Sequence, residues 1–168
     1  IVVVGLNADW ETESHDRPMF GLPGRQDELV RAVNAVNPNT IVVVNSGGPV
    51  DLPWLDEVGA VLLSWYPGQE FGGALADVIT GVCDPGGRMP VTFAHRVLDG
   101  PPALDVPGDG ERLHYREGLF VGHRWYDARG IEPRIAFGSG RSYTDFTMGD
   151  VTVSADAGRT VLHVPVTN

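Results

Sequence analysis

Three short apolar runs, separated by helical patterns, constrain the fold of this chain most strongly. Residues 1–4, 40–45 and 60–64 each have the β-branched, continuous character of a buried strand. Residues 25–36 and 71–79 predict helices. The first of these helices has four apolar residues on one face, Leu29, Val30, Val33 and Val36. The β-α-β-β-α order predicts an α/β fold, with a mainly parallel, doubly wound sheet and right-handed crossovers.

The character of the sequence changes after Cys83. Residues 89–93 predict a further strand, at a sheet edge because Pro90 lacks an N–H group. From Phe146 onward, a spaced series of valines is typical of the first strands of an all-β domain. Because the chain opens within one strand and stops within another, we expect it to be a segment of a longer polypeptide.

Composition excludes several classes of protein. The 168 residues allow one α/β domain and a short remainder. The formal net charge of −10 argues against nucleic acid or an anionic membrane as a partner. No apolar run approaches the roughly 20 residues of a membrane helix. Cys83 is the only cysteine, so an intrachain disulfide is excluded and the redox compartment stays open. The five histidines are scattered, without the spacing of a zinc site.

The loop after the first predicted strand is the best candidate for a site. Residues 5–24 lie where ligands bind in an open parallel sheet, beyond the carboxyl ends of the strands. The loop concentrates charged residues, which are Asp9, Glu11, Glu13, His15, Asp16 and Arg17. Crowded carboxylates favour a raised pKa in one of them, as a general acid requires, and Trp10 suits a sugar ring. The competing interpretation is a solvated acidic loop. The residues alone do not choose among the carboxylates.

Nucleotide binding is the obvious alternative for such a sheet. The segment that follows the first strand does not match the G-x-G-x-x-G pattern, and the chain has no phosphate-binding G-x-x-x-x-G-K-[ST] motif. The sequence therefore gives little support to a nucleotide-binding module.

Eight segments together resemble glycoside hydrolase family 3, the β-glucosidase family. They occur in the family's order and cover nearly the whole chain to Phe146: residues 10–17, 22–26, 45–50, 53–54, 65–70, 84–90, 115–118 and 137–144. The resemblance implies an α/β sandwich domain over residues 1–145, and the truncated start of a fibronectin type III-like β-sandwich over residues 146–168. It also implies a partner, an N-terminal (β/α)8 barrel of the same polypeptide that carries the nucleophilic aspartate.

The resemblance assigns roles within the acidic loop. The family's general acid/base is a glutamate in an E-G-x-D-R context, which places it at Glu13, with Ser14 in the position of the usual glycine. Trp10, Asp16 and Arg17 become candidates for substrate binding. The implied parent is a retaining, exo-acting β-glucosidase that acts on an oligosaccharide or on an aryl or alkyl β-glucoside, with no metal or organic cofactor. The alternatives are a β-xylosidase or another glycosidase of the same family, and a non-catalytic carbohydrate-binding or scaffold domain.

Overall fold

The computed structural model describes residues 1–106 and 108–168, with side chains throughout except at positions 103 and 104. The chain folds into two compact units. The first consists of Ile1–Phe71 and Arg88–Ser139, and the second of Gly72–Gly87 and Gly140–Asn168.

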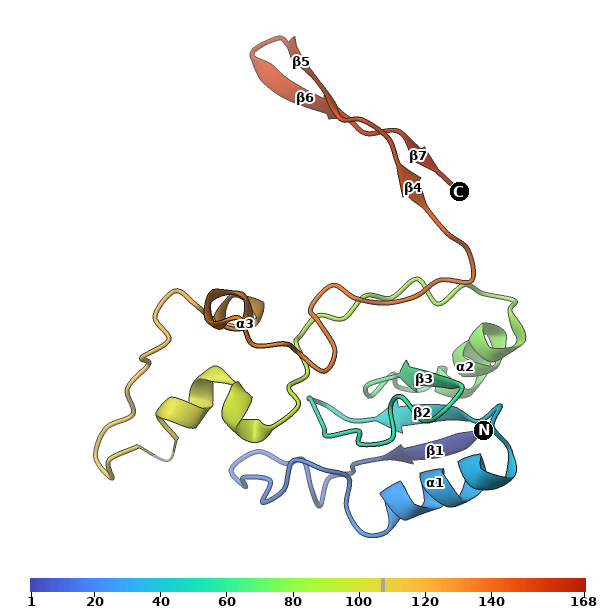
Figure 1. Cartoon of the computed structure of the whole chain (residues 1–168), viewed down its shortest axis with the longest axis vertical. Coiled ribbons are helices and arrows are strands. Elements are labelled where there is room, and N and C mark those ends of the chain that lie inside the picture. The colour runs from blue at the N-terminus through green and yellow to red at the C-terminus, as the bar shows by residue number, and fades with distance from the viewer. Residues whose placement is uncertain (107) are drawn as a thin grey trace. The chain divides into compact units, whose positions relative to one another are not determined.

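A parallel sheet forms the centre of the first unit (Figure 1). Its strands are β1 (Val2–Gly5), β2 (Ile41–Asn45) and β3 (Ala60–Leu63), in the order β1-β2-β3. Val43 of β2 is in register with Val3 on one side and with Leu62 on the other. The parallel α/β arrangement predicted from the sequence is confirmed for these three strands.

Burial differs between the strands because only β2 has a neighbour on each side. Val42, Val43 and Val44 of β2 are fully buried. In β1, Val2 and Val4 are buried, whereas Val3 is 54% exposed. The prediction of continuous burial over residues 1–4 is therefore wrong for the first strand. Successive side chains of an edge strand point to opposite faces, and only alternate ones reach the core.

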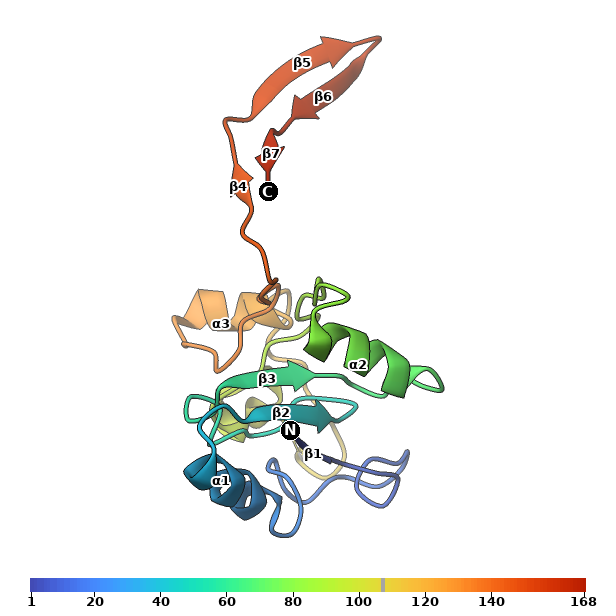
Figure 2. The same cartoon turned by 90° about the vertical axis from the view of Figure 1, so that its right-hand side faces the viewer.

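Helix α1 (Gln26–Val36) packs against β1 (Figures 1 and 2). Its buried stripe is centred on Val30 and Val33. Leu29 is 50% exposed and Val36 is 84% exposed, which corrects the prediction that all four apolar residues face the core. At 100° per residue these two positions lie on the flank of the stripe, where the sheet does not reach them. The indole Nε1 of the fully buried Trp54 donates to Asp27 at 2.7 Å.

The predicted strand over residues 89–93 is not formed in this segment, all of which the structure describes. Met89 N–H donates to the carbonyl of Ser139 at 2.8 Å, and Phe93 N–H donates to that of Ile135 at 2.9 Å. Pro90 interrupts the ladder between these two points because it has no N–H to donate. The segment nevertheless delivers Phe93, 1% exposed, to the main core.

A second, smaller core surrounds helix α3 (His123–Arg129). It buries Ala94, Trp125 and Tyr126. Trp125 Nε1 donates to the carbonyl of Asp99 at 2.9 Å, at the end of the 3-10 helix η1 (Val97–Asp99). A further 3-10 helix, η2 (Pro101–Leu104), follows η1.

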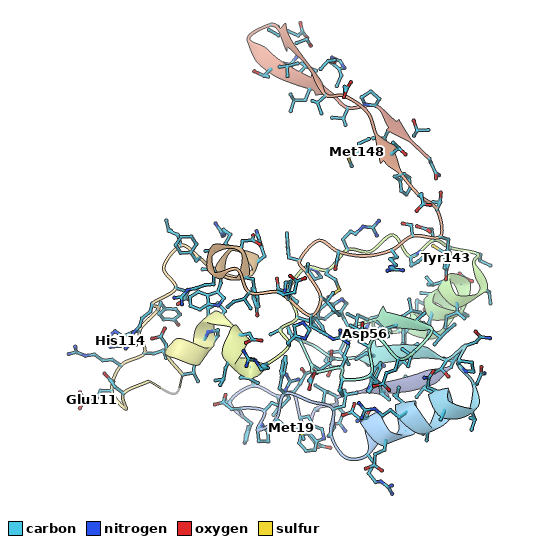
Figure 3. The ribbon with its side chains drawn as sticks, in the orientation of Figure 1. Met19, Asp56, Glu111, His114, Tyr143 and Met148 are labelled. Atoms are coloured by element: carbon cyan, nitrogen blue, oxygen red, sulfur yellow. The ribbon has the colours of Figure 1, made fainter. Side chains whose placement is uncertain are left out.

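The second unit contains most of helix α2 (Phe71–Thr80), which the sequence predicted over residues 71–79. Tyr143, labelled in Figure 3, donates its hydroxyl to the carbonyl of Val78 at 2.7 Å and its N–H to Asp84 at 2.6 Å. These bonds attach the C-terminal segment to α2 and to the turn after it.

Four short strands end the chain. Strand β4 (Thr147–Met148) pairs with β7 (Val166–Thr167), and β5 (Thr152–Asp156) forms an antiparallel hairpin with β6 (Arg159–His163). Their apolar side chains are largely exposed, with Val153 at 67% and Leu162 at 62%. The expected β-structure after Phe146 is present. Its fibronectin type III-like character and the domain boundary at residues 145 and 146 stay predictions, as does a second helical layer on the sheet. No helix among the described residues is long and apolar enough to cross a membrane.

Because β1 approaches β2 closely at Gly5, we expect a side chain at this position to destabilise the fold. A Cβ added there would lie 2.1 Å from the carbonyl oxygen of Asn45, which already accepts the Leu6 N–H at 2.8 Å. Because two backbones cannot move apart without losing their pairing, we expect Gly5→Ala to lower the free energy of unfolding by about 3 kcal/mol. Urea unfolding followed by tryptophan fluorescence measures this. Gly21→Ala is the control, since its Cβ meets nothing within 4 Å. An equal effect of both changes would contradict the explanation.

Candidate functional site

The loops that follow the three parallel strands meet at one edge of the sheet. Strands β1 and β2 end at Gly5 and Asn45, and β3 is followed by Ser64. The side-chain amide of Gln26, at the start of α1, fixes the first of these ends. It accepts the Gly5 N–H at 2.7 Å and donates to the Gly5 carbonyl at 3.0 Å. The loop after β1 therefore leaves the sheet from a fixed point (Figure 1).

Glu13 lies at the tip of a small hairpin in this loop. Thr12 and His15 form an antiparallel bridge, so Glu13 and Ser14 are the two turn residues between them. Ser14 has φ of 68°, a left-handed conformation that costs a serine more than a glycine. Ser14 occupies the position for which the resemblance implies a glycine, and here a serine adopts this conformation.

The Glu13 side chain is exposed. Within the part of the chain that the structure describes, its carboxylate takes part in no hydrogen bond or ion pair. It lines an open hollow of about 400 Å³. The hollow is lined by Glu11, Thr12, Glu13, Gly47, Gly48 and Tyr66. Glu13 is thus a free carboxylate that faces solvent at the edge of the sheet.

Glu11, two residues earlier, is in the opposite situation. Its carboxylate accepts from Arg17 Nη1 at 3.2 Å and from the Gly47 N–H at 2.6 Å, and it also accepts the hydroxyl of Tyr66. Both side chains of the Glu11–Arg17 pair are only 19% exposed. Arg17 Nη2 donates in addition to the carbonyl of Pro49 at 2.7 Å. We call Glu11, Arg17, Gly47 and Tyr66 the Glu11 cluster.

The Glu11 cluster leaves little space for a side chain at residue 47. A Cβ there would lie 3.0 Å from Tyr66 Cε2 and 3.1 Å from Glu11 Oε2. A side chain at residue 47 would therefore require the Glu11 carboxylate or the Tyr66 ring to shift by a few tenths of an ångström.

Trp65 and Tyr66 diverge where the chain leaves β3. Trp65 has φ of 56°, which is uncommon for a bulky residue. Its ring packs edge-on against Phe93, with 6.2 Å between centroids and 78° between planes. Tyr66 is 51% exposed and points its hydroxyl to Glu11. Trp65 therefore packs against the core, whereas Tyr66 lines the hollow.

The other predicted site residues have different surroundings. Trp10 is partly buried against the main core and lines a separate hollow of about 280 Å³, together with Gly5 and Gln26. Asp16 is exposed, and Arg17 belongs to the Glu11 cluster. Their contact with a substrate stays a prediction. Sequence reasoning missed Gly47 and the link from Tyr66 to Glu11, because these partners lie 36 and 55 residues from Glu11.

Among the described residues, no group of three or more His, Cys, Asp or Glu side chains is placed to hold a metal ion.

Comparison with known proteins identifies the family. Residues 1–123 match the domain described as the glycosyl hydrolase family 3 C-terminal domain. A β-glucosidase of Rhizobium radiobacter is 48% identical over 153 residues, covering 89% of this chain and 19% of that protein. A thermostable β-glucosidase B of Acetivibrio thermocellus is 44% identical, covering 91% of this chain and 20% of that protein. The chain belongs to glycosyl hydrolase family 3, and it spans about a fifth of the length of these relatives.

Solved structures agree with the sequence relatives. A β-glucosidase of Kluyveromyces marxianus in complex with glucose superposes with a TM-score of 0.84 and 41% identity, covering 90% of this chain and 18% of that one. A family 3 β-glucosidase of Bifidobacterium adolescentis gives a TM-score of 0.90 and 37% identity, covering 99% of this chain and 25% of that one. The family resemblance inferred from the eight sequence segments is confirmed.

The Glu11 cluster makes a prediction about the ionisation of Tyr66. Partial burial, followed by the hydrogen bond to Glu11 and that carboxylate's charge, raises the pKa of Tyr66 from 10.0 to about 12. A pKa raised by folding means that the hydrogen bond is fully present below pH 10 and is lost as the pH rises through about 12. Ultraviolet titration of the protein, minus that of Tyr66→Phe, isolates this tyrosine among the four.

In Glu11→Ala we expect the isolated Tyr66 transition to move to lower pH, because the hydrogen bond and the negative charge are both lost. Glu57→Ala is the matched control, since Glu57 pairs with Arg31 on the surface at 3.4 Å. An unchanged transition in Glu11→Ala would contradict the assigned contact.

Proposed function

We propose that this chain is the part of a retaining, exo-acting β-glucosidase that supplies the general acid/base, and that Glu13 is that residue. One observation carries the proposal: in an acidic loop beyond the carboxyl end of β1, Glu13 is a free carboxylate while its neighbour Glu11 is fully engaged. Relatives of this chain are named β-glucosidases, and one of them was solved in complex with glucose.

Glu13 would act twice in such a reaction. A retaining glycosidase first forms a covalent glycosyl-enzyme intermediate, during which the acid protonates the departing oxygen. The same residue then removes a proton from the water that releases the sugar. The nucleophile in this scheme is an aspartate of the N-terminal barrel, outside this chain. The two carboxyl groups must come within about 5–5.5 Å of each other, so the Glu13 hairpin would face the barrel's active site.

The neighbouring carboxylates suit this role less well. The oxygens of Glu11 already accept from Arg17, from the Gly47 N–H and from Tyr66. A general acid must instead present a protonated oxygen to the leaving group within hydrogen-bonding distance. Asp16 lies beyond the hairpin rather than at its tip, and it does not line the hollow that Glu13 shares with Tyr66.

Glucose is the sugar that the relatives' names favour. The family resemblance places most of the residues that select the sugar in the barrel. A xylosidase of the family would therefore present the same hairpin, and the hairpin does not distinguish the two activities. The proposal needs no metal and no organic cofactor, because its two steps use only carboxylates and water.

The proposal predicts that this chain alone does not hydrolyse glycosides. A retaining mechanism needs two carboxylates, and the nucleophile would lie in the missing barrel. Assay of the purified 168-residue chain on an aryl β-glucoside should give no turnover. Turnover that disappears in Glu13→Gln would overturn the division of the site between two domains.

In the full-length polypeptide, Glu13→Ala should discriminate between leaving groups. Acid assistance is worth roughly 10²–10⁴-fold and matters most when the leaving oxygen is poorly stabilised. Cellobiose hydrolysis should therefore fall by about that factor, while formation of the intermediate from a nitrophenyl glucoside should fall much less.

Azide gives this prediction a second readout. Loss of the base should slow release of the sugar, so that the intermediate accumulates and added azide restores turnover by attacking without base help. Asp16→Ala is the control on the same loop and should not respond to azide. Rescue of Asp16→Ala, with no rescue of Glu13→Ala, would move the acid/base to position 16.

A further inference from the structure

The Glu11 carboxylate joins the loops that follow all three parallel strands. It belongs to the loop after β1, accepts the Gly47 N–H from the loop after β2, and accepts the Tyr66 hydroxyl from the segment after β3. At the base of the Glu13 hairpin, Arg17 Nη1 pairs with the Glu11 carboxylate at 3.2 Å. Arg17 also donates a hydrogen bond to the Pro49 carbonyl. Every one of these partners lies within the first unit.

The Glu13 hairpin has little else to hold it at its tip. Glu13 and Ser14 are exposed turn residues, and the bridge between Thr12 and His15 is a single pair. His15 Nδ1 lies 3.4 Å from the Glu13 carbonyl, which is a contact within the hairpin itself. Among the described residues, the side-chain hydrogen bonds and the ion pair that link the hairpin to the rest of the unit therefore lie at its base, at Glu11 and Arg17.

We infer that Glu11 and Tyr66 are positioning residues, whose bond at the sheet edge sets the place of the Glu13 carboxylate. This rests on the proposed function of Glu13. Glu11 does not exchange protons with the substrate; it fixes one end of the turn, and Tyr66 fixes Glu11 against the segment after β3. Gly47 completes the arrangement through its N–H, and its lack of a side chain leaves room for both partners.

Position matters here because proton transfer depends steeply on geometry. A catalytic group misplaced by about 1 Å can lose about 10²-fold in rate. A hairpin released from Tyr66 would keep its carboxylate but would spend less time within reach of the leaving oxygen. The defect should therefore resemble a partial loss of Glu13, and it should be largest for the substrate that most needs protonation.

The test uses the full-length enzyme with cellobiose and a nitrophenyl glucoside. In Tyr66→Phe we expect kcat/KM to fall about tenfold for cellobiose and less than about threefold for the nitrophenyl glucoside. In Glu11→Ala we expect kcat/KM to fall about 10²-fold for cellobiose and less than about tenfold for the nitrophenyl glucoside. Tyr66→Phe keeps the half-exposed ring and removes one oxygen, so it remains informative even if Glu11→Ala folds poorly.

Two matched variants control for general destabilisation. Tyr143→Phe removes a hydroxyl that donates to the Val78 carbonyl, and Glu57→Ala removes a surface carboxylate that binds Arg31. Both should leave the ratio of the two kcat/KM values unchanged. If the Glu11 cluster had a merely structural role, its variants would lower kcat/KM equally for both substrates, in step with a fall in the thermal unfolding temperature. That result would overturn the inference.

Azide separates failure of the inference from failure of the proposed function. Glu11→Ala should not be rescued, because the Glu13 carboxylate remains near the site and its negative charge disfavours azide. If Glu13→Ala shows leaving-group selectivity and rescue while Glu11→Ala and Tyr66→Phe behave like the controls, only the positioning role is wrong. If azide rescues Glu11→Ala and not Glu13→Ala, Glu11 is itself the acid/base, and both proposals fail.

Discussion

The carboxylate of Glu11 is the interaction on which the geometry of this sheet edge depends. It is only 19% exposed, and a charge so far removed from water must be matched by donors. A guanidinium, a backbone N–H and a phenol provide them, and each comes from a different part of the sequence. The need to satisfy one partly buried charge therefore brings three loops together.

The same interaction gives two neighbouring glutamates different surroundings. Glu11 is held among donors, whereas Glu13 stands on a two-residue turn in an open hollow. Environment rather than residue type distinguishes the two carboxylates, as in other paired-carboxylate sites. The turn that carries Glu13 includes Ser14 at positive φ, between the bridged residues Thr12 and His15.

These loops begin at the ends of a closely packed sheet. Strand β2 is buried on both faces, Gly5 lets β1 approach Asn45 closely, and Gln26 bonds both polar backbone groups of Gly5. Trp65 packs on Phe93 despite a strained backbone, and it thereby turns Tyr66 toward Glu11. Core packing and strain at one residue set the orientation of the next.

The sequence by itself determined the elements whose signals are local. The three parallel strands, α1 and α2 follow from apolar runs and periodicity, and the ordered motifs identified the family. Exposure of Val3 and Leu29, and the interrupted pairing of residues 89–93, depended on which neighbours each element found. The different surroundings of Glu11 and Glu13 likewise emerge only in the tertiary structure. The donors that bind Glu11 at Gly47 and Tyr66 are far away in the sequence, and no local pattern records that they meet.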